Sequence, residues 1–167
     1  ATQVGGLTTT QISGLSTTVI RGLNETDVAE FSTTQLGALS ATQLGALTST
    51  AFSGLDGTQV GSLSTTQLRG LTTTQVGGLS TTDISEFTST QVGSLATTQL
   101  GAFSTTNINA LDTTQLSGLT ATQLGKLSNA NLSALDETQI QSLTTTQVAG
   151  LTTTQISSLS TTDVNEF

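Results

Sequence analysis

The sequence predicts an all-α solenoid in which short, capped helices stack around one axis. Three observations predict it: the chain divides into twenty-one octads without insertion or deletion, apolar residues recur at two fixed places, and a helix-capping pair recurs at two others. The octads run from Ala1 to Phe167, and only the last residue of the final octad is missing. A fixed short period is typical of repeat architectures. We therefore expect residues 1–167 to form a single continuous array, as a segment of a longer repeat protein.

Each octad follows the same pattern, whose positions we label a to h, with Ala1 at a and Thr8 at h. Position d is always apolar, and position g is Leu or Phe. Position b is Thr everywhere except at Ala130, and position c is most often Gln. Position h is Ser, Thr, Asp or Asn except at Ala96, and all glycines except Gly57 fall at e or f.

Positions h and c together form the pattern of a helix capping box. A Ser or Thr side chain at the helix start accepts from the backbone N–H three residues on, while a Gln there reaches back to the first N–H. The apolar residue before the cap packs on the fourth helical residue in the same motif, here Leu71 and Val76. The pattern therefore predicts that a helix starts in each octad.

A continuous helix does not fit the period. Eight residues at about 100° each displace the apolar face by roughly 80° per octad, so it would wind around the helix. A coiled coil needs a repeat of seven or eleven residues. We expect each octad to form a short helix and then change direction at g and h. Because helices under about 12 residues are marginal alone, stability must come from stacking.

The alternative is a β-solenoid, because Thr, Val and Ile favour strands and the glycines could form its corners. Strand parity speaks against it, since g and the next d are five residues apart and would point to opposite faces. A largely disordered chain is the third possibility. Glycine at e and f costs about 1 kcal/mol each in a helix. Either a close approach of two backbones or a left-handed helix end at f would explain them.

The composition excludes several functional classes. The chain has no His or Cys, only three basic residues (Arg21, Arg69, Lys126), 8% charged residues and a net charge of −8. Nucleic-acid binding depends on cationic contacts, and no apolar run approaches the length of a membrane span, so we expect neither nucleic acid nor membrane insertion. No nucleophile–base pair or phosphate loop occurs. We expect no catalytic activity, cofactor, metal site or small-molecule substrate.

Three octads carry an acidic variant with Asp at c and Glu at f: Asp27/Glu30, Asp83/Glu86 and Asp163/Glu166. One interpretation is a calcium site, but calcium prefers six to eight oxygen ligands and each octad offers two carboxylates. The other is that Asp replaces Gln in the capping box, near a helix N-terminus that favours negative charge, while Glu is solvated. We favour the second interpretation, and the sequence leaves calcium binding open.

The nearly invariant Thr at b is not explained by helix propensity, since β-branching lowers it. Two interpretations are open. The hydroxyls could form a ladder against the backbone or Gln of neighbouring octads, or they could form an exposed array that binds ice or another ordered surface. We favour the ladder.

The unit Leu63-Ser64-Thr65-Thr66-Gln67-Leu68-Arg69-Gly70-Leu71 resembles the Thr/Gln/Leu-rich octapeptide arrays of very large secreted or surface proteins of bacteria, including adhesin-like chains. The resemblance implies a structural repeat protein at the cell surface or outside the cell, forming a stalk, a filament or a surface layer with adhesive properties. Repeated surfaces readily make contacts that propagate as fibres, so we expect self-association. The alternative is a module that binds ice, a glycan or a partner surface through the repeated Thr face.

Overall fold

The computed structural model describes residues 4–161, and these form one short 3₁₀ helix and nineteen α-helices, with no strand among them. The all-α prediction is confirmed, and the β-solenoid is wrong. The elements are η1 (Val4–Gly6), α1 (Thr9–Ser13), α2 (Thr17–Arg21), α3 (Glu25–Ala29), α4 (Thr33–Gly37), α5 (Ala41–Leu44), α6 (Ser49–Phe52), α7 (Gly57–Ser62), α8 (Thr65–Leu68), α9 (Thr73–Gly77), α10 (Thr81–Ser85), α11 (Ser89–Ser94), α12 (Thr97–Leu100), α13 (Thr105–Asn109), α14 (Thr113–Ser117), α15 (Ala121–Leu124), α16 (Asn129–Leu132), α17 (Glu137–Gln141), α18 (Thr145–Val148) and α19 (Thr153–Ser158).

Each α-helix begins at position a, directly after the residue at h that caps it. In α9 the Thr72 Oγ1 accepts from the Gln75 N–H at 3.1 Å, and the Gln75 Oε1 accepts from the Thr72 N–H at 2.7 Å. This reciprocal pair is the predicted capping box. Ala96 has no side-chain acceptor, so there only the Gln99 half of the box remains, with Oε1 accepting from the Ala96 N–H at 2.8 Å.

Each helix ends within a few residues in a tight turn between positions d and g. In α9 the Leu79 N–H donates to the Val76 carbonyl at 3.3 Å. No glycine among the described residues has a positive φ, so the left-handed helix end considered for position f is wrong. The glycines at f continue in the right-handed helical region, as at Gly78 with φ −90° and ψ −2°.

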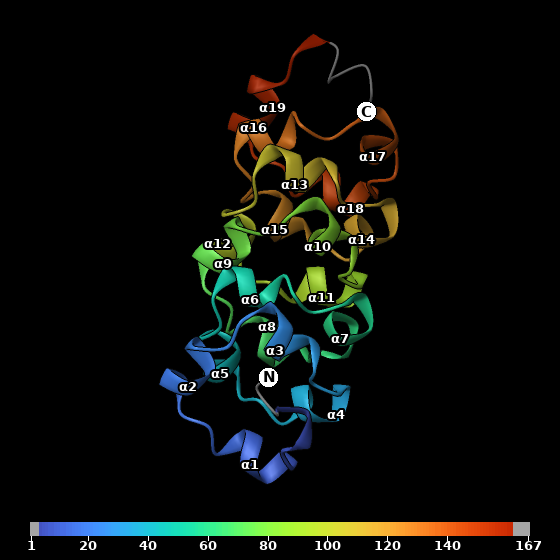
Figure 1. The fold of residues 1–167 in the computed structure, drawn as a ribbon. Helices are drawn as coiled ribbons and strands as arrows, with labels where there is room; N and C mark the ends of the chain where they lie inside the picture. Colours follow the sequence, from blue (N-terminus) through green and yellow to red (C-terminus); the bar gives the residue numbers. More distant parts are fainter. Residues whose placement is uncertain (1–3, 162–167) are drawn as a thin grey trace.

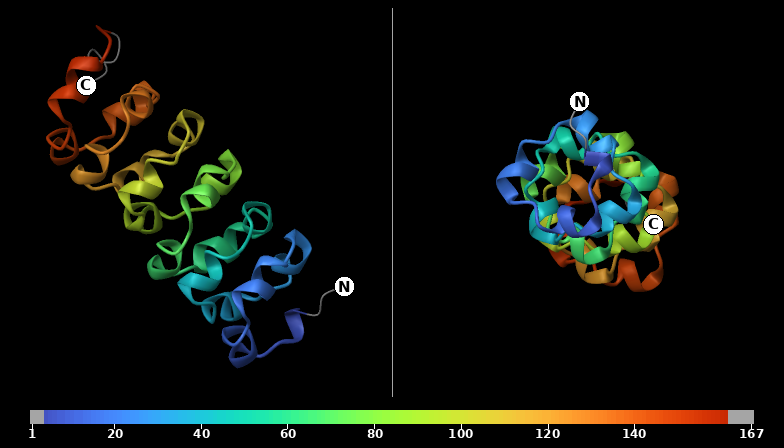
Figure 2. Two further views of the ribbon diagram at one scale, coloured as in Figure 1. Left: turned by 90° about the vertical axis from the view of Figure 1, so that its left-hand side faces the viewer. Right: turned by 60° about the horizontal axis from the view of Figure 1, so that its bottom comes forward.

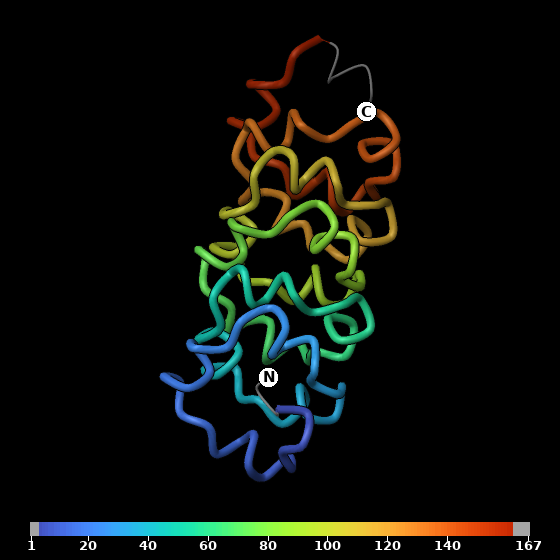
Figure 3. Tube along the Cα trace, in the orientation of Figure 1, coloured from blue at the N-terminus to red at the C-terminus, as the bar shows by residue number. Residues whose placement is uncertain are grey.

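The short helices wind around a common axis as a superhelix (Figures 1 and 3). Each helix packs on the helix three further along the chain, as in α1 with α4, α5 with α8 and α11 with α14. Hydrogen bonds from position c reach four octads back, from Gln75 to Leu44 and Leu47. One superhelical turn therefore takes between three and four octads, and α1 and α19 lie at opposite ends of the long dimension (Figure 2).

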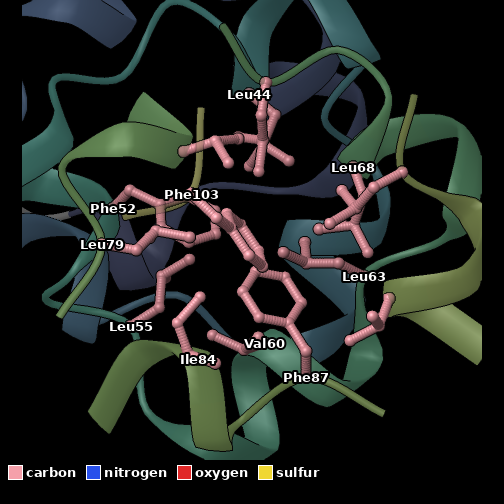
Figure 4. Packing of buried hydrophobic residues seen from close by; sticks show 14 of the residues in the cluster. Leu44, Phe52, Leu55, Val60, Leu63, Leu68, Leu79, Ile84, Phe87 and Phe103 are labelled. Atoms are coloured by element: carbon pink, nitrogen blue, oxygen red, sulfur yellow. The ribbon is translucent and has the colours of Figure 1, made fainter. Parts of the chain in front are cut away.

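Positions d and g fill the interior of the superhelix. Every d residue from Val4 to Ile140 and every g residue from Leu23 to Leu135 is buried, and together they form one continuous cluster. Figure 4 shows such side chains pointing toward one another from several octads. The only Phe at position d, Phe52, stacks on Phe87 with ring centroids 6.5 Å apart. The core is therefore one apolar column along the axis, as the octad pattern predicts.

Candidate functional surfaces and turn-to-turn contacts

The side chain at position c connects successive turns of the superhelix. The Gln91 Nε2 donates to the Val60 carbonyl at 2.8 Å and to the Leu63 carbonyl at 2.9 Å, and these carbonyls lie 31 and 28 residues earlier. The Gln91 Oε1 accepts from the Thr88 N–H at 2.9 Å. One buried amide therefore both caps its own helix and satisfies two carbonyls of the turn before.

The same bonds recur along the array, and we call them the glutamine ladder. Its members are the buried residues at c that donate to carbonyls 28–31 residues earlier: Gln35, Gln43, Gln59, Gln67, Gln75, Gln91, Gln99, Asn107, Gln115, Gln123, Asn131, Gln139, Gln147 and Gln155. The shorter Asn107 reaches only the Leu79 carbonyl, at 2.9 Å. Because the acceptors are backbone carbonyls in the interior, an apolar residue at c would leave them without a donor, which costs free energy of folding. The amide at c removes that cost.

A second turn-to-turn contact joins position f to position a of the octad three before it. A Cβ added at Gly118 would lie 2.7 Å from the carbonyl carbon of Ser89, and one added at Gly54 would lie 2.7 Å from the Cα of Glu25. Both are closer than real Cβ contacts. The glycines at f therefore permit two helix backbones to touch, which confirms the close-approach interpretation.

The two residues that meet in this contact, at positions a and f, are matched in size along the sequence. The five glycines at f that have a turn beneath them lie 29 residues after a residue unbranched at Cβ: Glu25/Gly54, Ala41/Gly70, Ser49/Gly78, Ser89/Gly118 and Ala121/Gly150. Where the residue at a is Thr, the residue 29 positions later is Ala, Ser or Lys, as in Thr73/Ala102. The variation at a and f, which looks like drift within one octad, is thus paired between turns.

In the acidic octad that contains Asp83, the turn-to-turn hydrogen bond at position c runs in the opposite direction to those of the glutamine ladder. The Asp83 Oδ2 accepts from the Ser80 N–H at 2.7 Å, which confirms that Asp serves as the box partner. A carboxylate cannot donate to the preceding turn, and instead the Ser53 hydroxyl donates to Oδ2 at 2.9 Å. Asp27 likewise accepts from the Asn24 N–H at 3.0 Å, and Asp163 and Glu166 lie outside the described residues.

Glu86, the second carboxylate of this octad, is not simply solvated as predicted. It lies at f against Gly57, and its Oε2 is buried without a hydrogen-bond partner. Burial raises the pKa of the Glu86 carboxyl, and the negative charges of Asp83 and Asp56 raise it further. Within residues 4–161 no three His, Cys, Asp or Glu side chains lie close enough to hold a metal ion.

A shallow surface groove of about 500 Å³ lies where α8, α11 and α14 meet, and its lining residues are Thr65, Arg69, Ser89, Thr90, Gly93, Ser94, Ser117 and Gly118. Small residues at a, e and f create it. Arg69 forms one wall and donates from Nε to the Ser94 carbonyl at 2.8 Å. No pattern within one octad indicates this groove, because its lining residues come from octads three and six apart.

The Thr residues at b that the structure describes face solvent. Each described member from Thr10 to Thr154 is exposed, and within the described part of the chain none of their hydroxyls forms a hydrogen bond. The ladder interpretation of position b is therefore wrong. Positions c and d turn toward the axis, so b, one residue earlier in each helix, points away from it. The turn-to-turn ladder is built from position c.

Comparison with known proteins identifies the repeat but no close relative. The ALTTAQ repeat matches four overlapping segments, residues 28–65, 52–89, 60–97 and 92–129, which together span most of the chain. The segment Ala38-Leu39-Ser40-Ala41-Thr42-Gln43, at positions f to c, has Ala, Leu and Gln at the same places as these six letters. Searches among curated proteins and among solved structures found no match. None of the described helices is long and apolar enough to cross a membrane.

Proposed function

Because this chain belongs to the ALTTAQ repeat family, we propose that it is a structural repeat protein that forms an extended extracellular stalk, filament or surface layer. The glutamine ladder carries this proposal. It begins at Gln35, where the first complete turn lies beneath position c, and it continues to Gln155. Each octad is held by the turn before it and holds the turn after it, so the array gains length without changing its cross-section.

The location outside a bacterial cell rests on the resemblance of the octads to secreted and surface arrays. The chain has no Cys and therefore relies on no disulfide in an oxidising compartment. Its exposed surface consists mainly of Ser and Thr hydroxyls with few charges. Such a surface suits a spacer that holds other segments at a distance, and the adhesive role belongs to the same proposal.

Small-angle X-ray scattering tests the extended shape. The 167-residue chain should scatter as a rod, and a chain with the segment 33–128 duplicated in register should be a longer rod of unchanged cross-sectional radius. A duplicated chain that becomes thicker instead of longer would overturn the proposal. Antibody labelling of intact and permeabilised source cells tests the location: labelling of intact cells supports a surface role, and labelling only after permeabilisation contradicts it.

A second candidate function is surface binding through the exposed Thr array at position b. The observation that favours it is that these hydroxyls are free to bind a ligand or a surface. Thermal hysteresis measures binding to ice, and glycan arrays measure binding to sugars. Replacing Thr66, Thr90 and Thr114 with Lys should abolish either activity. The unchanged circular dichroism of that variant is the control, and equal binding by the variant and the parent would exclude the Thr array.

A further inference from the structure

The groove where α8, α11 and α14 meet holds one cation among hydroxyl groups. Its volume of about 500 Å³ lies within the range of small-ligand sites. Thr and Ser residues and Arg69 line it, Gly93 and Gly118 add no side chain to it, and no acidic residue contributes. The whole chain has eleven acidic residues and only three basic ones. The groove therefore places a positive charge without a negative one on an acidic protein.

A hydrogen bond to the next turn of the superhelix fixes the Arg69 guanidinium. Its Nε donates to the Ser94 carbonyl at 2.8 Å. No described residue accepts a hydrogen bond from its two Nη groups or pairs with its charge. These groups form the planar pair of donors that binds a carboxylate through two parallel hydrogen bonds. Because one end of the guanidinium is already held, binding costs less side-chain entropy than it would at a freely moving Arg.

The hydroxyls around Arg69 suit the polar groups that accompany such a carboxylate. Those of Thr65, Ser89 and Thr90 form no hydrogen bond with any residue in the described part of the chain. Each hydroxyl can therefore both donate to a ligand and accept from it. The groove thus offers one charged donor pair and three free hydroxyls on neighbouring helices.

We propose that this groove binds an acidic sugar residue, with Arg69 holding its carboxylate and the Thr and Ser hydroxyls holding its ring hydroxyls. One guanidinium matches one negative charge on each sugar ring. The net charge of −8 on the chain opposes a denser polyanion, such as a chain of phosphates. The inference rests on the adhesive role within the proposed function and names the ligand class for it.

The lining of the groove favours a sugar over an acidic peptide. Peptides are recognised through exposed strand edges, apolar grooves or clusters of cationic residues. Residues 4–161 contain no strand, and the groove is lined by a single Arg with no Leu, Val, Ile or Phe. A sugar ring carries several hydroxyls, and these match the hydroxyls of the lining.

A titration of the isotope-labelled 167-residue chain with tetragalacturonate, followed by NMR, tests the inference. The Gly93 and Gly118 amide signals should shift and saturate, and added salt should weaken the binding. Methyl-esterified tetragalacturonate keeps the hydroxyls without the charge and should bind about tenfold more weakly. A hexaglutamate peptide carries the charge without the ring hydroxyls and should also bind more weakly. Equal binding of the peptide and tetragalacturonate would overturn the assignment to a sugar.

Arg69→Asn removes the free end of the guanidinium and preserves its bond to the next turn. Asn109, which occupies the same position e in α13, donates from Nδ2 to the Ala134 carbonyl at 3.1 Å. That carbonyl lies 25 residues later, as Ser94 does from Arg69. The variant should therefore melt like the parent and bind tetragalacturonate about tenfold more weakly. Unchanged binding would overturn the site.

Two further variants separate the hydroxyls from a general effect of charge. Ser89→Ala removes one free hydroxyl at a position where Ala41 occurs naturally, and it should weaken binding about threefold. Arg21→Asn changes the Arg at position e of α2, outside the groove, and should bind like the parent. An equal loss in the Arg21 and Arg69 variants would overturn the site. A rod-shaped chain that binds no tetragalacturonate would overturn the site alone, whereas a compact chain would overturn the extended structure of the proposed function.

Discussion

Two contacts between successive turns of the superhelix, which we call the glycine junction and the acidic junction, share one backbone arrangement. They differ in the direction of the hydrogen bond at position c and in the residues that meet at positions a and f. At the glycine junction, Gln115 donates to the Ile84 carbonyl of the preceding turn, and Gly118 of the same octad touches Ser89 of that turn. At the acidic junction, Asp83 accepts from the preceding turn and Glu86 packs over Gly57. Both octads keep their caps and their buried d and g residues. The fold therefore depends on the apolar and capping positions, while c, a and f determine how tightly two turns are joined.

The difference also shows how substitutions are compensated. Asp83 removes a donor, and Ser53 supplies one from the other side. Glu86 needs space at position f, and the only glycine at position a lies beneath it. The compensating residue lies 29 or 30 positions earlier in both cases. In this octad each substitution is thus matched by a residue that lies against it one turn away.

The largest effect is expected from removing an amide of the glutamine ladder. Gln91→Ala leaves the buried Val60 and Leu63 carbonyls without a donor and removes half of a capping box. We expect a loss of about 3 kcal/mol in the free energy of unfolding, measured by urea denaturation. Gln11→Ala is the control, because Gln11 caps its helix without reaching a turn, and it should cost about 1 kcal/mol or less. Equal losses would contradict the ladder.

The next largest effect is expected from filling the glycine contact. Gly118→Ala places a Cβ 2.7 Å from the carbonyl carbon of Ser89 and should destabilise the chain by about 2 kcal/mol, since backbone must move. Gly61→Ala meets nothing within 4 Å and should stabilise it by up to about 1 kcal/mol through helix propensity. Thermal melts of the two variants should therefore shift in opposite directions.

A smaller effect is expected from changing the a–f pair at the acidic junction. A Cβ at Gly57 would sit 3.4 Å from the Glu86 Cγ, so the branched side chain of Gly57→Thr should collide with Glu86 and cost about 1 kcal/mol. Adding Glu86→Ala restores the Thr and Ala pair present at Thr73 and Ala102, and should recover the loss. A double-mutant cycle measures this coupling, and additive effects would refute size matching between turns.

The smallest expected effect is a pH dependence that belongs to Glu86. Its pKa in the folded chain is raised above the ordinary 4.5 by burial and by Asp83 and Asp56. The folded chain therefore binds this proton more tightly than the unfolded chain, so the destabilisation by Glu86 is present at neutral pH and is relieved as pH falls through the raised pKa. Glu86→Gln should be more stable than the parent at pH 7, and the two melting temperatures should converge toward pH 4.5. A constant difference would contradict the assignment.

The sequence alone was sufficient for the helical class, the caps and the core. Ser, Thr and Gln form the capping box through bonds only three residues apart, and the apolar residues at d and g fall on one face of a short helix, so local rules predict both. The glycines at e and f also indicated close approach, although the sequence equally allowed a left-handed helix end.

Only the tertiary structure determined which octads contact each other. Those contacts in turn determine that b is exposed, that c forms hydrogen bonds between turns and that f lies against a neighbouring backbone. The octad period fixes no superhelical pitch, because pitch depends on how side chains at a and f hold neighbouring turns apart. Once a turn takes between three and four octads, Gln at c meets carbonyls 28 and 31 residues earlier, and Thr at b faces solvent. The Asp83–Ser53 and Glu86–Gly57 pairs become visible only at that spacing, since long-range contacts follow from packing and not from local propensity.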